Sequence, residues 1–166
     1  MANNYENIVL FGFSDIQIKK EGEKTYQPLI GGIGVQVDIS VENITASNKN
    51  DTYIIASNMI AEGQLTLLEL SLDHRQLLFG HEIQTVDGMR CLVVKDTDSC
   101  PKFSLKFSRK KANGKRIIYE ILSVVFSENS IQADTMKEGQ IEESNITINF
   151  EIQKVNGILY RVFEEQ

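Results

Sequence analysis

The clearest pattern in the chain is a regular alternation over positions 35–42, where Val35, Val37, Ile39 and Val41 alternate with polar residues. Successive side chains of a β-strand point to opposite faces of the sheet, so this segment predicts a strand that is buried on one face only. Similar alternation, or enrichment in β-branched and aromatic residues, predicts further strands over positions 8–18, 62–72, 102–108, 116–126, 145–152 and 158–163, with a shorter one at 91–94.

Tight turns are expected between two pairs of these strands. Asn113-Gly114 lies between the strands at 102–108 and 116–126, and Asn156-Gly157 follows the strand at 145–152. An Asn-Gly pair favours the left-handed backbone that a two-residue hairpin turn requires. The sequence therefore predicts two β-hairpins, the first with a basic tip and the second formed by the last two strands.

One short helix is predicted at 73–80, DHRQLLFG. Ser71 or Asp73 can cap its start, because short polar side chains accept hydrogen bonds from the first free N–H groups, and Gly80 can end it. Seven or eight strands with one short α-helix favour an all-β fold. We expect an antiparallel β-sandwich or barrel in which the helix covers one edge.

Two polar stretches are predicted to be long loops, at about residues 43–59 and 127–143. The first surrounds a brief apolar run with asparagines and an aspartate, and both are long for connections in a compact domain. Long ordered loops are commonly functional, so both are candidates for contacts with other molecules.

The size and composition fit one soluble domain spanning residues 1–166. The chain is 42% hydrophobic and 24% charged, which is ordinary for a globular protein that buries its own core. No apolar run approaches the roughly 20 residues of a membrane span, and the start lacks the basic segment of a secretory signal. We expect no membrane partner and a cytoplasmic site of synthesis, where Cys91 and Cys100 stay reduced.

The charge is unevenly distributed. The net charge is -6, although five of the 17 basic residues cluster at the tip of the first predicted hairpin, leaving 12 basic against 23 acidic residues elsewhere. These five are Arg109, Lys110, Lys111, Lys115 and Arg116. An acidic chain repels nucleic acid, so a solvated tip or a salt bridge with an acidic partner is a better interpretation of this cluster.

Catalytic and metal-binding patterns are weak. His74, His81, Cys91 and Cys100 are spaced more widely than the close pairs of structural zinc sites. The Asp96-Thr97-Asp98 stretch lacks the glycine of a calcium loop, the glycines at 31–34 open a strand and not a helix, and no nucleophile has a recognisable base. We predict no catalytic residue, no metal and no cofactor, and that the protein is not an enzyme.

Four stretches in a fixed order carry a family resemblance. They are TYQPLIGGIGVQVDISVE, AEGQLTLLELSLDHRQLLFGHEI, CPKFSLKFSRKKANGKRIIYEILSVVF and QADTMKEGQIEESNITINFEI. Together they resemble the bacteriophage major tail protein, or tail tube protein, of long non-contractile tails. In that family a glycine-preceded strand, a short helix ending in glycine, a charged hairpin and a polar threonine-containing segment follow in order. Gly63, Gly80, Gly114 and Thr135 occupy those places here.

The resemblance implies a β-sandwich subunit that self-assembles into stacked, hexameric rings. The inner sheets of such rings join into a continuous barrel, and the tube lets double-stranded DNA pass without binding it specifically. The expected partners are other copies of the chain and the tail tape-measure, tail-tip and tail-terminator proteins. The expected location is the virion tail tube, assembled in the host bacterial cytoplasm.

The alternation places a set of polar residues on the face opposite the core, and the resemblance favours the tube lumen for that face. The candidate lumen-facing residues are Gln36, Asp38, Ser40, Glu42, Glu62, Gln64 and Thr66. The candidate intersubunit residues lie in the first long loop and at the basic tip, and are Asn48, Asn50, Asp51, Tyr53, Arg109, Lys110, Lys111, Lys115 and Arg116. The acidic segments expected to meet the tip are 134–143 and Glu164-Glu165.

Two other interpretations stay open. A tube protein of a contractile tail or secretion apparatus shares the expected architecture, and a neighbouring sheath gene would distinguish it. A ligand-binding β-sandwich module belongs to a different class. The absence of tryptophan disfavours it, and monomeric behaviour at high concentration would favour it.

Overall fold

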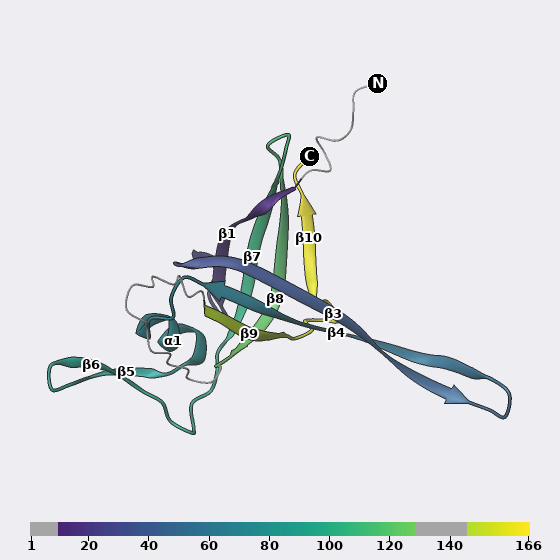
Figure 1. Ribbon diagram of the computed structural model, residues 1–166, viewed down its shortest axis with the longest axis horizontal. Helices are drawn as coiled ribbons and strands as arrows, with labels where there is room; N and C mark the ends of the chain where they lie inside the picture. Colours follow the sequence, from purple (N-terminus) through teal and green to yellow (C-terminus); the bar gives the residue numbers. More distant parts are fainter. Residues whose placement is uncertain (1–9, 129–145) are drawn as a thin grey trace, which may run out of the picture.

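The computed structural model describes residues 10–128 and 146–166, which form ten strands and one helix (Figure 1). The elements are β1 (Leu10–Lys20), β2 (Gln27–Pro28), β3 (Gly32–Ser47), β4 (Thr52–Leu67), α1 (Leu72–Phe79), β5 (Glu82–Val86), β6 (Met89–Val93), β7 (Lys102–Lys111), β8 (Arg116–Ser127), β9 (Ile146–Ile152) and β10 (Tyr160–Glu164). The predicted all-β fold with one short helix is confirmed. Within the described residues, no helix has the length and apolar character needed to span a membrane.

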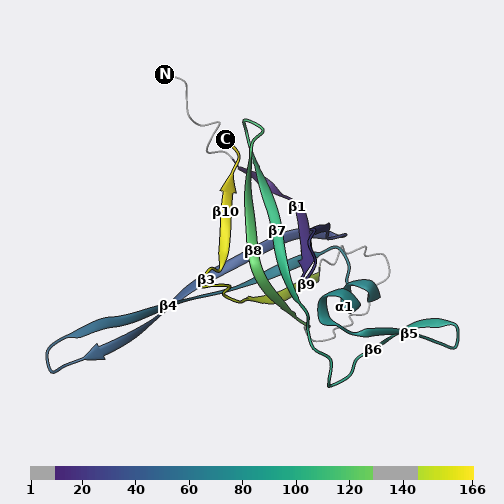
Figure 2. The same ribbon diagram turned by 180° about the vertical axis from the view of Figure 1, so that it is seen from behind.

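Eight strands form one antiparallel sheet in the order β2-β1-β7-β8-β9-β4-β3, and β10 pairs with β8 outside this path. β8 is long enough to serve two partners on the same edge: Ile117–Ile121 pairs with β10, and Val124–Ser127 pairs with β9. The β9-β4-β3 layer therefore crosses the layer of β1, β7, β8 and β10 (Figures 1 and 2). The result is a sandwich-like wrap that does not close into a barrel.

The core lies between these two layers. Phe126 of β8 packs between Phe103 of β7 and Phe150 of β9, with ring centroids 5.8 and 5.7 Å apart. Leu65 of β4 is fully buried beside them. A side chain at Gly63 would clash with the Gln36 carbonyl and the Phe150 ring, so the close approach of β4, β3 and β9 requires glycine there.

Helix α1 follows the sequence prediction closely. The Ser71 hydroxyl accepts a hydrogen bond from the His74 N–H at 3.2 Å, and Gly80 ends the helix with a φ of 75°. Leu78 and Phe79 are buried, which fixes the helix against the sheet, while Leu77 is exposed. Local capping signals were therefore sufficient to place this element.

The prediction of a long loop at 43–59 is wrong. β3 and β4 continue through it as a paired hairpin, with Asn43 opposite Ser57 and Ser47 opposite Thr52. Only residues 48–51 form the connection, where the Asn48 side chain accepts hydrogen bonds from the backbone N–H groups of Asn50 and Asp51. Both faces of this part are exposed, so no buried stripe marks it as strand in the sequence.

Three other predictions need correction. The strand predicted at 62–72 ends at Leu67. The single strand predicted at 91–94 is the second half of a β5–β6 hairpin. The final strand does not form a hairpin with β9: Asn156-Gly157 does reverse the chain, but β10 returns to pair with β8. Apart from Ser127, which ends β8, and Glu128, the loop predicted at 127–143 lies outside the described residues.

Candidate assembly surfaces

The seven residues predicted to face a lumen lie together on the outer face of the β9-β4-β3 layer. The strand register places Gln36 opposite Gln64 and Asp38 opposite Glu62, with Ser40, Glu42 and Thr66 continuing the same face. All are exposed except Thr66, which is half-buried. The structure thus confirms that they share one solvent-facing surface, called here the polar face. That this face lines a channel stays a prediction.

The sequence prediction missed the contribution of β9 to the polar face. The register places Thr147 opposite Thr66, Asn149 opposite Gln64 and Glu151 opposite Glu62. The alternation of 145–152 marks these three residues as outward-facing, but only the tertiary pairing shows which strand they join. The polar face therefore spans three strands and not two.

A row of carboxylates crosses the polar face. Asp38, Glu62 and Glu151 occupy directly opposed positions on β3, β4 and β9. The Gln36 amide donates to both carboxylate oxygens of Asp38 at 3.1 Å, and a shallow depression between Glu62 and Glu151 is lined by further polar groups. Like charges opposite one another lower the stability of a sheet, so stability alone does not account for this row.

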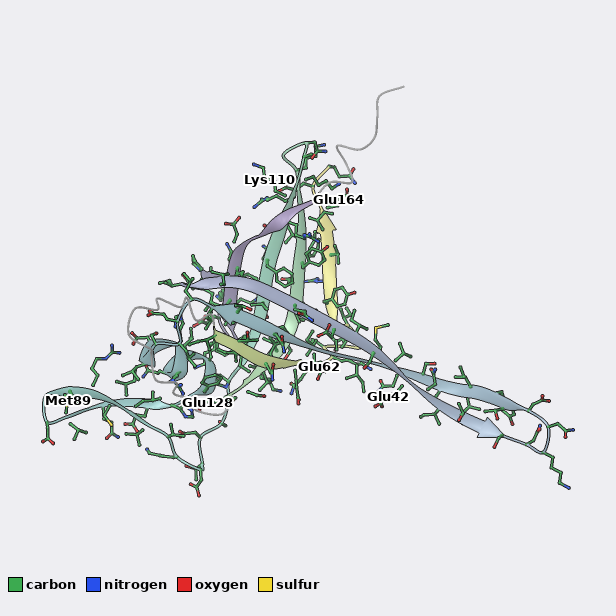
Figure 3. All side chains as sticks on the ribbon, viewed as in Figure 1. Glu42, Glu62, Met89, Lys110, Glu128 and Glu164 are labelled. Atoms are coloured by element: carbon green, nitrogen blue, oxygen red, sulfur yellow. The ribbon has the colours of Figure 1, made fainter. Side chains whose placement is uncertain are left out.

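The outer half of the β3–β4 hairpin, residues 39–60, projects from the body and is called here the arm (Figures 1 and 3). Its end carries the candidate contact residues Asn48, Asn50, Asp51 and Tyr53, all of which are exposed. Large apolar side chains are exposed along its length: Ile39, Val41, Ile44, Tyr53, Ile54, Ile55, Met59 and Ile60. Many exposed large apolar side chains on one element favour an interaction site, because water solvates them poorly.

The basic tip pairs largely within its own chain. Lys111 is buried and forms an ion pair with Glu164, and Arg116 forms one with Glu165 at 2.7 Å. Because β10 pairs antiparallel with β8, its end lies beside the tip and places Glu164 and Glu165 there (Figure 3). The Arg116 side chain and backbone N–H together hold the pKa of the Glu165 carboxyl below its usual range.

In the single chain Glu164 and Glu165 already pair with Lys111 and Arg116, and a contact of the tip with these acids of another copy stays a prediction. The other predicted acidic segment, 134–143, lies outside the described residues. Lys110 and Lys115 are exposed at the turn, and Arg109 is half-buried. These three remain candidates for contacts with another molecule.

An apolar groove of about 220 Å³ lies where β3 leaves the other layer. Val35, Val37 and Ile39 form one wall, and Phe107, Tyr119 and Tyr160 form the other. The Phe107 and Tyr119 rings stack with centroids 5.3 Å apart. The groove is bounded by β3 and β10, each of which has one edge without a partner among the described strands.

Comparison with known proteins adds no relative to this picture. No protein-family model matches the chain, and a search of the curated proteins also finds no match. The surfaces described above therefore carry the functional argument on their own.

The four residues considered as zinc ligands do not form a metal site: the two histidines are hydrogen-bonded to other groups, and the two cysteines are free. His74 bonds to Ser71 and to the Ile30 carbonyl, while His81 lies between two carboxylates. Cys91 and Cys100 are free thiols. Across 10–128 and 146–166, no group of three or more His, Cys, Asp and Glu side chains is arranged to hold a metal ion.

Proposed function

We propose that this chain is a structural subunit that assembles with copies of itself into the tail tube of a bacteriophage with a long non-contractile tail. The observation that carries the proposal is the arm, which extends the sheet beyond its own core and exposes apolar side chains on both faces. A two-stranded ribbon of this kind is marginally stable alone and gains stability when a neighbour covers it. In a stacked tube that neighbour is another copy of the chain.

The free strand edges support the same proposal. An exposed edge invites pairing with another strand, and closed rotational symmetry satisfies such edges with copies of the same molecule. Within the described part of the chain, β3 has such an edge at one end of the pairing path, and β10 has one off the path, where it pairs only with β8. In the proposed ring, the β9-β4-β3 layers of neighbouring copies join side by side to form the inner wall.

The polar face then faces the DNA. The carboxylates of Asp38, Glu62 and Glu151 repel phosphates, and none of the residues named for this face is a lysine or arginine, so the face offers DNA few counterion-releasing contacts. Such a wall lets the polymer slide. Tape-measure, tip and terminator proteins would meet the tube only at its interior or its ends.

Two rival functions make different predictions. A tube of a contractile tail or secretion apparatus uses the same surfaces but requires a sheath around it. A ligand-binding module would use the apolar groove, although its volume of about 220 Å³ is below the roughly 300–1,000 Å³ of ordinary ligand pockets. The groove is also an open channel between two strand edges.

Negative-stain microscopy of the purified protein across a concentration series tests the proposal. We expect rings and tubes from the native chain, and monomers from an Ile44→Ser/Ile54→Ser/Ile55→Ser variant with unchanged thermal unfolding. An Ile30→Ser/Leu68→Ser variant is the matched control, because it removes exposed apolar side chains from the body and should still assemble. A native chain that stays monomeric at high concentration, or an arm variant that assembles normally, would contradict the proposal.

A further inference from the structure

A buried histidine lies at the base of the β5–β6 hairpin. His81 follows Gly80 at the end of α1, and its side chain is only 7% exposed. Its Nδ1 lies 2.8 Å from an Asp98 oxygen, its Nε2 lies 2.5 Å from a Glu128 oxygen, and the Phe79 ring packs against it. Each ring nitrogen therefore faces a carboxylate.

This geometry specifies the charged form of the ring. A neutral imidazole has one N–H donor, and an ionised carboxylate can only accept, so both contacts form together only when both nitrogens are protonated. Burial alone would lower the pKa of His81. The hydrogen bonds to Glu128 and Asp98, with the charges of those carboxylates, outweigh it and raise the pKa above its ordinary value.

His74, seven positions earlier, is bonded in the opposite way. The Ser71 N–H donates to His74 Nδ1 at 3.3 Å, and Nε2 lies 2.8 Å from the Ile30 carbonyl oxygen. One nitrogen accepts and the other donates, which a neutral ring satisfies completely. The two histidines are close in sequence, so His74 provides an internal control for His81.

The two carboxylates come from segments that are distant in sequence. Asp98 belongs to the turn after β6, where it also accepts from the Lys95 N–H at 2.9 Å, and Glu128 directly follows β8 (Figure 3). Arg75 of α1 forms an ion pair with Glu128. His81 thus joins α1, the hairpin and the end of the main sheet.

The hairpin has few other strong attachments among the described residues. β5 and β6 pair only with each other, and an isolated two-stranded ribbon is marginally stable in water. The ion pairs Lys95–Glu82 and Arg90–Asp73 are exposed, and pairs of that kind contribute little. The contacts of His81 are therefore the main polar connection between this hairpin and the body.

We propose that the His81 imidazolium is a proton-dependent clamp that holds the β5–β6 hairpin and α1 to the end of β8. Loss of its proton leaves one donor between Asp98 and Glu128, whose negative charges then lie on either side of a neutral ring. Of the other groups at the site, Arg75 pairs with Glu128, and burial and the Glu128 charge raise the pKa of the Cys100 thiol. The clamp forms within one chain, so it does not depend on the proposed function.

The direction of the pH effect follows from the raised pKa. A protonated group favoured by the folded state stabilises it fully below the unfolded pKa, near 6.5 for histidine, and this stabilisation is lost as pH rises through the folded pKa. One proton is involved. The protection of the hairpin amides therefore falls by at most about tenfold per pH unit between the unfolded and the folded pKa, and it levels off above the folded one.

Two measurements on the native full-length chain test the clamp. Ring-nitrogen NMR should show His81 doubly protonated at neutral pH and His74 as the neutral Nε2–H form. Hydrogen-exchange protection factors for β5 and β6 should fall as His81 titrates, while those of β7 and β8 stay constant. A neutral His81 ring below pH 6.5 would overturn the proposal. So would protection factors of β5 and β6 that stay constant while His81 loses its proton.

Variants separate the clamp from general packing. Asp98→Asn removes one carboxylate, so His81 should titrate at lower pH and hairpin opening should shift with it. His81→Gln should remove the pH response and leave protection low throughout, whereas His74→Gln should keep it. An Asp98→Asn variant with an unchanged His81 titration, or a His81→Gln variant that retains the pH response, would overturn the clamp.

Discussion

The two halves of the β3–β4 hairpin have the same backbone pairing but different surroundings. In the body, Val35 and Leu65 are 7% and 0% exposed because the layer containing β7 and β8 covers them. In the arm, the same ladder continues, but Ile39 and Ile54 are 44% and 59% exposed. Backbone hydrogen bonds therefore maintain the strand geometry, whereas burial by a second layer supplies most of the stability.

The sharpest test of this comparison truncates one aliphatic side chain in each half. Leu65→Ala should destabilise the chain by about 2–5 kcal/mol, because it leaves a cavity in a fully packed core. Ile54→Ala should change the stability of the isolated subunit by less than about 0.5 kcal/mol. Urea unfolding of both variants measures the difference. Equal losses would mean that the arm is packed in the free subunit.

Assembly should reduce the difference in hydrogen-exchange protection between the arm and the packed half of the hairpin. In the free subunit the arm amides between Tyr53 and Met59 should exchange quickly, because little burial opposes local opening. In the assembled tube their protection should rise by on the order of tenfold or more, while the amides around Leu65 change little. Hydrogen exchange on both samples measures this. Equal arm protection in both states would contradict a role in contacts between copies.

Charge reversal tests the polar face, which begins in the packed half and continues into the arm at Glu42. Asp38→Lys/Glu42→Lys/Glu62→Lys should permit tubes of normal length but slow DNA ejection severalfold, because each lysine adds a counterion-release contact with phosphate. The effect should grow at low salt, where screening is weaker. A neutral triple variant, Asp38→Asn/Glu42→Gln/Glu62→Gln, is the control. Ejection at the normal rate in low salt would place this face outside the channel.

The smallest expected effect concerns the basic tip. Lys110→Glu/Lys115→Glu should slow tube growth without unfolding the subunit, because screened surface pairs contribute only about 0–1 kcal/mol each and act through repetition. Lys20→Glu/Lys24→Glu makes the same change in net charge away from the tip and should grow normally. Light scattering at two salt concentrations measures the rates. Growth that is indifferent to both substitution and salt would exclude the tip from the interface.

Local signals in the sequence were sufficient for several elements. The strand over 35–42, the hairpin around Asn113-Gly114 and the capped helix each depend on residues close together in the chain. The β5–β6 hairpin also had such a signal, because Asp87-Gly88 occupies its turn with positive φ angles of 50° and 78°. The sequence interpretation passed over that pair and placed only the second strand.

Other features depend on tertiary pairing and had no local signal. The arm lacks a buried face, so its alternation is weak and its length was mistaken for a loop. The partner of β10 is β8, more than one strand away along the chain, and this choice brings Glu164 to Lys111. The contribution of Glu151 to the polar face and the meeting of His81 with Glu128 have the same origin.

The sharing of β8 between the two layers has a mechanical consequence. A load applied to the arm enters β4, crosses the backbone ladder into β9, and reaches β8 without passing through a flexible linker. At the point where β8 changes partners, the Gln153 N–H donates to the Ser123 carbonyl at 2.9 Å and ties the turn after β9 to the same strand. Tension on the arm is therefore carried as shear between the hydrogen-bonded strands β4, β9 and β8.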